Sequence, residues 1–146
     1  IVFEPALIVP GNGRIDGGYA GAEALLGIEP PPTAVFCSND LTAIGAIRAI
    51  KKQGLRVPQE VSVVGFDALP FTAFIDPQLT TVRQHRYTMG RLATERVLDL
   101  LNGQSPEANV YVKGDLVVRE SCAAPQVMGS TVNQNNYKSE QEEIRK

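Results

Sequence analysis

The stretch that decides the fold is AVFCSNDLTAIGAIRAIKKQGLRVPQEVSVVGFD, residues 34–67. It begins and ends with short apolar runs rich in strand-forming residues, at 34–37 and 61–66, and such runs favour buried β-strands. Between them, apolar residues recur every third position, which predicts an amphipathic helix. The residues on this stripe are Leu41, Ile44, Ile47 and Ile50. A strand, a helix and a second strand in this order form a right-handed crossover, so we expect two parallel, adjacent strands.

Local signals mark both ends of this helix. Asp40 stands where an N-cap is expected, because its carboxylate can accept hydrogen bonds from the free N–H groups of the first turn. Gly54 suits the left-handed position after the last turn, and Pro58 prevents the helix from resuming. The helix is therefore predicted to lie between Asp40 and Gly54.

Polar residues follow the predicted strands at the edge where the carboxyl ends of the strands meet. Asn39 follows the first strand, Asp67 follows the second, and Gln84 follows a third strand predicted at 79–83. Open parallel sheets bind ligands at this edge. Amide and carboxylate groups suit sugar hydroxyls, which both donate and accept hydrogen bonds. We therefore expect these three residues to bind a small polar ligand; the alternative is that Asn39 and Asp67 only cap the elements that follow them.

The segments on either side of this unit are less regular. A strand at 6–9, a glycine-rich loop at 11–18 and a helix at 17–26 are expected before it. The glycine spacing matches neither the dinucleotide-binding fingerprint nor a P-loop, so phosphate binding is not predicted. After the unit, the apolar segment 68–77 either folds back onto the core or is covered by a partner, because an exposed patch of this kind is costly.

A further amphipathic helix is predicted from Tyr87 to Leu101, with Asn102–Gly103 ending it. Beyond it, 110–112 and 116–118 supply one or two closing strands. Residues 126–146 are polar and rich in amides, and we expect them to be a disordered tail.

The bulk composition excludes several classes of protein. The chain has 146 residues, of which 43% are hydrophobic, and a net charge of −2, which suits one domain and gives no field that would attract nucleic acid. No segment approaches the roughly 20 apolar residues of a membrane span. Cys37 and Cys122 are far apart and lack metal-site spacing, so neither a disulfide scaffold nor a zinc site is expected.

An enzyme would need a nucleophile with its base, a paired acid and base, or a metal cluster. His85 is the only histidine, and no serine or cysteine stands in a nucleophile motif. Asp40 and Asp67 at one edge are similar to the acidic cluster of a phosphate-receiving domain, but Arg83 and Gln84 do not supply the lysine that such a domain needs. We therefore expect no catalysis, no cofactor and no metal. Because His85 directly follows Gln84, it is a possible ligand contact.

Four strings carry a resemblance to a known family: SNDLTAIGAIRAIK, LRVPQEVSVVGFD, PQLTTVRQ and LVVRES. They resemble the effector-binding core of the lactose-repressor/galactose-repressor (LacI/GalR) family of bacterial transcription regulators, in the family's usual order and spacing. The resemblance runs from about Pro5 to Ser121. It implies a periplasmic-binding-protein-like, Rossmann-like α/β fold, which is an open, mainly parallel sheet with helices on both faces. This chain is then the carboxy-terminal part of a two-subdomain core.

The resemblance also implies which residues form the site. In the family, the residues that match Asn39, Asp67 and Gln84 commonly contact the effector. The position of Gly13 usually carries an aromatic ring that stacks on a sugar or base. Without that ring, either another residue supplies the apolar face or the ligand is not a flat-faced pyranose. Arg14 and Tyr19 are the nearest residues that could supply this face, and Gly13 and Arg14 are further possible ligand contacts.

The resemblance implies a homodimer, because the segment after the second strand lies at the subunit interface in the family. The expected interface residues are Leu69, Phe71, Phe74 and Ile75. The helix at 87–102 packs in the family on an amino-terminal half that this chain lacks. We therefore expect residues 1–125 to form the carboxy-terminal part of the core, with 126–146 outside it.

On this interpretation the chain belongs to a longer protein with a helix-turn-helix upstream, and only that upstream part reads operator DNA. The present chain then senses a sugar or sugar-like metabolite in the cytoplasm, dimerises and binds no membrane. The alternative is a periplasmic sugar-binding protein of a transport system, which shares the fold and the logic of the site.

Overall fold

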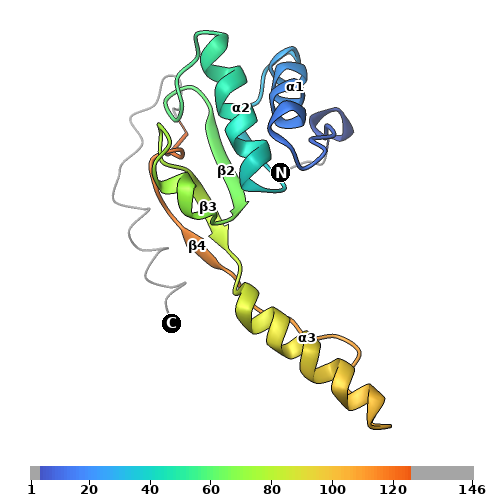
Figure 1. Cartoon of the computed structure of the whole chain (residues 1–146). Coiled ribbons are helices and arrows are strands. Elements are labelled where there is room, and N and C mark those ends of the chain that lie inside the picture. The colour runs from blue at the N-terminus through green and yellow to red at the C-terminus, as the bar shows by residue number, and fades with distance from the viewer. Residues whose placement is uncertain (1–3, 126–146) are drawn as a thin grey trace.

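The computed structural model describes residues 4–125 (Figure 1), so the predicted tail at 126–146 lies outside the described residues. The sheet contains β1 (Ala34–Phe36), β2 (Ser62–Asp67), β3 (Thr80–Arg83) and β4 (Asp115–Val117). The α-helices are α1 (Ile15–Leu26), α2 (Asp40–Lys52) and α3 (Arg86–Leu101), and short 3-10 turns form η1 (Pro5–Leu7) and η2 (Pro70–Ala73).

The four strands form one sheet in the order β1-β2-β3-β4. The pairs β1–β2 and β2–β3 are parallel, and β4 is antiparallel to β3. The crossover predicted from residues 34–67 is therefore confirmed. Because the first three strands run in the same direction, their carboxyl ends meet at one edge of the sheet.

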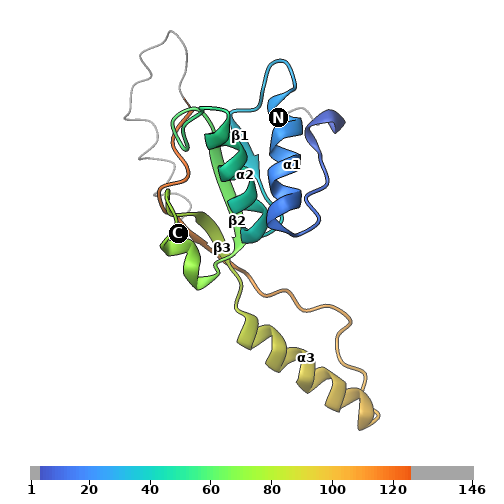
Figure 2. The same cartoon turned by 45° about the horizontal axis from the view of Figure 1, so that its top comes forward.

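The core lies between α2 and one face of the sheet. Alternate strand residues face α2: Val35 pairs with Val63, and Gly65 pairs with Thr81. α1 in turn packs on α2 at close range, and the two helices lie side by side in Figures 1 and 2. The largest buried apolar side chains at the centre are Ile50, Leu79 and Val63.

The opposite face of the sheet is more open. Phe36 pairs with Val64 on this face, and its side chain is 68% exposed. Leu116 of β4, which pairs with Val82, is exposed as well. In the part of the chain that the structure describes, no helix shields Phe36, so the second helical layer expected of the fold is not among the described elements.

α3 projects away from the body of the molecule (Figures 1 and 2). None of its residues is buried, although its sequence carries an apolar stripe. Its packing on the other half of a two-part core stays a prediction. None of the helices within residues 4–125 has the length and apolar character needed to cross a membrane.

Two predicted strands are absent at their expected places. Residues 6–9 contain the end of η1 followed by irregular backbone. Pro5 and Pro10 flank this segment and have no N–H groups to give to a ladder. Residues 110–112 also form no strand, and Tyr111 is almost fully exposed. Only the later closing strand pairs with the sheet, as β4.

Candidate functional site

The strand register brings the three predicted site residues to one edge of the sheet. Phe36 lies opposite Val64, so Asn39, three residues later, comes to the level at which β2 ends with Asp67. Asp67 lies opposite Arg83 on β3, and Gln84 follows at once. We call the edge formed by Asn39, Asp67 and Gln84 the rim.

Asp67 and Gln84 are in direct contact across the rim. The Gln84 side-chain Nε2 donates a short hydrogen bond to Asp67 Oδ1. Both residues are half-buried. Asp67 Oδ2 receives no hydrogen bond from residues 4–125, so the pair keeps acceptor capacity for a ligand. Their meeting is what the sequence analysis expected from the ends of parallel strands.

Asn39 is the N-cap of α2, and it also holds the glycine-rich loop. Its Oδ1 accepts a hydrogen bond from Thr42 N at 2.8 Å, while its Nδ2 donates to the carbonyl of Gly13 at 3.0 Å. Asn39 therefore does cap α2, and its contact with a ligand stays a prediction. One N–H and one oxygen lone pair of the amide remain for a ligand.

The prediction that Asp40 caps α2 is wrong, because Asp40 is the first residue of the helix and its carboxylate turns away from the helix end. The side chain is fully buried. Oδ1 accepts a hydrogen bond from the Thr81 hydroxyl on β3, and Oδ2 accepts one from Leu69 N at 2.7 Å. The sequence analysis missed the burial of the Asp40 carboxylate. Two residues could have indicated it: Gly65, which has no side chain and leaves space for the carboxylate, and Thr81, which lies beside Gly65 on the next strand and offers a hydroxyl donor.

The three residues predicted as possible ligand contacts have different surroundings. Gly13 has a φ of +66° and contributes its carbonyl to Asn39. Arg14 pairs with Asp16 at 3.4 Å beside α1. His85 Nε2 lies 3.2 Å from Asp115 Oδ2 on β4. Gly13 is thus joined to Asn39 of the rim. Arg14 and His85 each face a carboxylate, and the His85–Asp115 pair lies at the same end of the sheet as the rim, because Asp115 pairs with Arg83 next to Asp67.

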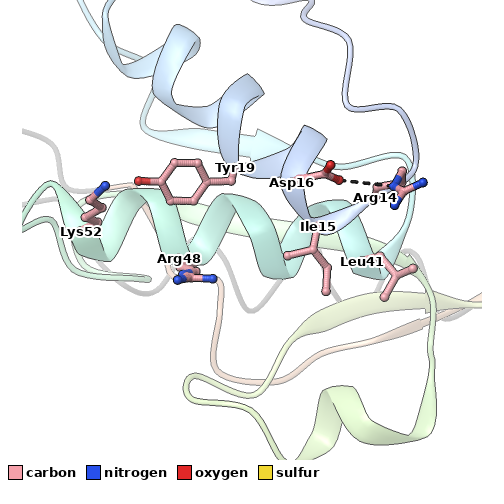
Figure 3. A pocket seen from close by; sticks show the side chains of 7 residues that line it. All are labelled: Arg14, Ile15, Asp16, Tyr19, Leu41, Arg48 and Lys52. Carbon is pink, nitrogen blue, oxygen red and sulfur yellow. Dashed lines mark ion pairs between the residues drawn. The ribbon is translucent and has the colours of Figure 1, made fainter.

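A pocket of about 820 Å³ lies on the surface, lined by side chains of α1 and α2, and it does not include the rim residues. Figure 3 shows Tyr19 from α1 pointing toward the end of α2 that carries Lys52. The Lys52 ammonium lies 5.4 Å from the centre of the Tyr19 ring, within the range of a cation–π contact. The lining residues are Arg14, Ile15, Asp16, Tyr19, Leu41, Arg48 and Lys52.

The predicted interface residues divide into an outer and an inner pair. Phe71 and Phe74 are 45% and 88% exposed. Ile75 packs against the core, and Leu69 is half-buried. Part of the segment therefore folds back onto the core, and the cover of its exposed part by a partner stays a prediction.

The same segment is fastened to α2 at both ends. Asp40, at the start of α2, accepts the hydrogen bond from Leu69 N. Lys51, near the end of α2, reaches both the carbonyl and the carboxylate of Asp76 at 2.7 Å. Residues 69–76 therefore follow the course of this helix.

The described residues hold no group of three or more His, Cys, Asp or Glu side chains placed to bind a metal. Cys37 is buried, and this burial raises the pKa of its thiol to about 12. Such a thiol stays protonated at neutral pH and is a poor nucleophile or ligand.

Comparison with known families matches residues 5–122 to the periplasmic binding protein-like domain. The chain belongs to this family. It is 43% identical over 125 residues to the HTH-type transcriptional repressor CytR of Escherichia coli K12, covering 85% of this chain and 37% of that protein. It is 46% identical to the regulator MalR of Streptomyces coelicolor, covering 75% of this chain and 32% of that protein.

Solved structures give the same result. A LacI transcriptional regulator from Bacillus cereus superposes with a TM-score of 0.80 at 28% identity, covering 86% of this chain and 45% of that one. The regulator CelR in complex with cellobiose gives 0.77 at 32% identity, covering 83% and 37%. This chain thus spans less than half of the proteins it matches.

These comparisons confirm the resemblance to LacI/GalR regulators and the mainly parallel α/β fold. The relatives are named as transcriptional repressors and regulators, and this favours the regulator interpretation over the transport protein.

Proposed function

We propose that this chain is the carboxy-terminal part of the effector-sensing core of a LacI/GalR-type transcriptional regulator, and that its rim binds a sugar or sugar-like metabolite. The observation that supports the proposal most directly is the Asp67–Gln84 pair at the carboxyl ends of two parallel strands. Open parallel sheets bind ligands at this position. Asn39 completes the rim through the cap of α2.

The chemistry of the rim suits a polyhydroxylated ligand. A hydroxyl can donate to the free oxygen of Asp67 and accept from an amide N–H of Asn39 or Gln84. A ligand without the matching hydroxyl leaves these groups unpaired, at a cost of about 1–3 kcal/mol for each group. Two proteins among the matches support the sugar class: one was solved with cellobiose, and another is named a ribose operon repressor.

The signal follows from unequal binding. A ligand shifts a conformational equilibrium only through its different affinity for the two states. In our proposal the ligand lies between this chain and the other half of the core, and it favours one arrangement of the two halves. Residues 69–75 pass the change to a second subunit, and operator DNA is read by a part of the protein outside this chain. Such a regulator acts in the cytoplasm and is not an enzyme.

The test is a thermal-shift screen of the chain against a panel of sugars that includes cellobiose and ribose at millimolar concentration. Bound ligand stabilises the folded state by RT ln(1 + [L]/Kd), or about 2.7 kcal/mol at 100 times Kd. We expect a sugar to raise the Tm of the wild-type chain and of Glu23→Ala, a control whose carboxylate is exposed on α1. The Asp67→Ala variant should lose this shift.

Two results contradict the proposal. If Asp67→Ala is stabilised as strongly as the wild type, Asp67 does not belong to the site. If no sugar in the panel stabilises the wild-type chain, the rim does not hold a sugar by itself; if the full-length regulator is not stabilised either, the proposed ligand class is wrong.

A further inference from the structure

Asp40 is a buried carboxylate that the proposed ligand contacts do not use. It is fully buried, and it accepts one hydrogen bond at each oxygen. The strand beneath it carries Gly65, and a Cβ at that position would come within 2.5 Å of Asp40 Oδ1. The absence of a side chain at Gly65 therefore leaves space in the sheet for this carboxylate. A carboxylate that only capped the helix and faced solvent would not need this space.

The two hydrogen bonds of Asp40 converge on the turn that follows Asp67. Leu69 N donates directly to Asp40 Oδ2 at 2.7 Å. Thr81 donates its hydroxyl proton to Asp40 Oδ1, and the same hydroxyl oxygen accepts from Ala68 N at 3.3 Å. One carboxylate thus fixes two successive backbone N–H groups, one of them through Thr81.

That turn has an unusual backbone conformation. Asp67 has a φ of +122° and Ala68 a φ of +53°. Residues other than glycine adopt such angles only where the surrounding structure enforces them. The turn decides where the Asp67 side chain points, because Asp67 is its first residue. In this structure it points at Gln84.

We propose that Asp40 and Thr81 are positioning residues for the rim: through the N–H groups of Ala68 and Leu69 they hold the turn that aims Asp67 at Gln84. This inference rests on the proposed function for its meaning in ligand binding. The geometric link itself can be tested without a ligand. Charge-assisted hydrogen bonds to a buried carboxylate are among the stronger ones in proteins, so the turn stays fixed before a ligand arrives.

The experiment compares Thr81→Val with Thr81→Ser in the ¹⁵N-labelled chain. Valine keeps the volume of threonine but removes the hydroxyl, whereas serine keeps the hydroxyl and removes a methyl group. Both changes are expected to lower the Tm. The reporter is the side-chain NH₂ of Gln84, whose hydrogen bond to Asp67 sets its NMR shift and its rate of exchange with water.

We expect Thr81→Val to move the Gln84 NH₂ signals toward those of the exposed Gln53 and to speed their exchange about tenfold, as the loss of one hydrogen bond to a charged group implies. Thr81→Ser should keep the wild-type signals. If both variants lower the Tm and leave the Gln84 signals unchanged, the network only stabilises the fold and the proposal is overturned.

A second variant covers the case in which Thr81→Val does not fold. Asp40→Asn has the same shape as the wild type, and its oxygen can still accept the hydrogen bond from Leu69 N. Its NH₂ group replaces Oδ1, so the Thr81 hydroxyl proton no longer has an acceptor. A smaller change at Gln84 is expected, and unchanged Gln84 signals in folded Asp40→Asn would overturn the proposal.

The NMR result and the sugar screen fail independently. Gln84 signals that respond in Thr81→Val while no sugar stabilises the chain or the full-length regulator would sink the proposed function and keep the positioning role. If a sugar binds through Asp67 while the Gln84 signals do not respond to Thr81→Val, the proposed function stands and the positioning role is wrong.

Discussion

At the scale of single residues, the rim is built from side chains that also hold the protein together. Asn39 caps α2 with its oxygen and ties the Gly13 loop with its nitrogen. A ligand that binds Asn39 therefore acts on a group already engaged with both α2 and the loop. If Asn39 binds the ligand that we propose, it would pass the change to the elements on either side of it.

The two functions of Asn39 can be separated by substitution. Asn39→Asp keeps an oxygen for Thr42 N but loses the N–H that bonds to the Gly13 carbonyl, so we expect it to cost about 0.5–1.5 kcal/mol in the free energy of unfolding. Asn39→Ala loses this bond and the cap together and should cost about 1 kcal/mol more. Urea unfolding measures both values. Equal losses in the two variants would show that the bond to Gly13, and not the cap, dominates.

At the scale of elements, α2 is the centre of the molecule. Its buried face covers the sheet, and its other side receives α1 so closely that no side chain fits between the backbones. A Cβ on Gly45 would lie 2.0 Å from the carbonyl oxygen of Ile15, and one on Gly18 would lie 2.0 Å from that of Thr42. The position of α1 is therefore set by two glycines.

Gly45→Ala tests this close approach. The added methyl group meets backbone atoms that cannot move aside, so we expect a loss of at least about 1–3 kcal/mol in the free energy of unfolding. Gly90→Ala on α3 is the matched control, since nothing lies within 4 Å of a Cβ there. It should be neutral or stabilise by about 0.5–1 kcal/mol. Urea unfolding of both variants decides, and similar effects would contradict the packing described.

At the scale of the whole molecule, two of the exposed apolar surfaces are candidate sites of association. One is the outer pair of the interface segment, with Phe74 88% exposed. The other is the stripe of α3, where Leu101 is 77% exposed. Only the first belongs to the homodimer interface we propose.

Phe74→Glu and Leu101→Glu distinguish the two surfaces. Each places a charge on an exposed apolar position, so neither should alter the fold. Sedimentation velocity should show that Phe74→Glu shifts a dimer toward monomer, whereas Leu101→Glu leaves the dimer and removes only larger species. The opposite pattern would place the interface on α3.

Much of this architecture could be predicted from the sequence, because its signals are local. Three features are decided by residues close together in the chain: the spacing of apolar residues along α2, the left-handed conformation of Gly54, and the aspartate at the end of β2. The cap was assigned to the wrong one of two adjacent residues, because Asn39 and Asp40 are both good caps and only the facing strands decide between them. Buried Ser121 was missed for the same reason, since its hydroxyl bonds to Val63 and Thr80 far away in sequence.

The segment 69–76, fastened at its two ends to the two ends of α2, has a mechanical consequence. Helix α2 is bonded to Asn39 of the rim at its first turn and to the segment 69–76 at both ends, so a rotation of α2 moves the rim and this segment together. In the regulator that we propose, a tilt of α2 imposed by a ligand through Asn39 would carry Phe71 and Phe74 with it, so ligand binding at the rim and the contact between two subunits would depend on the movement of the same helix.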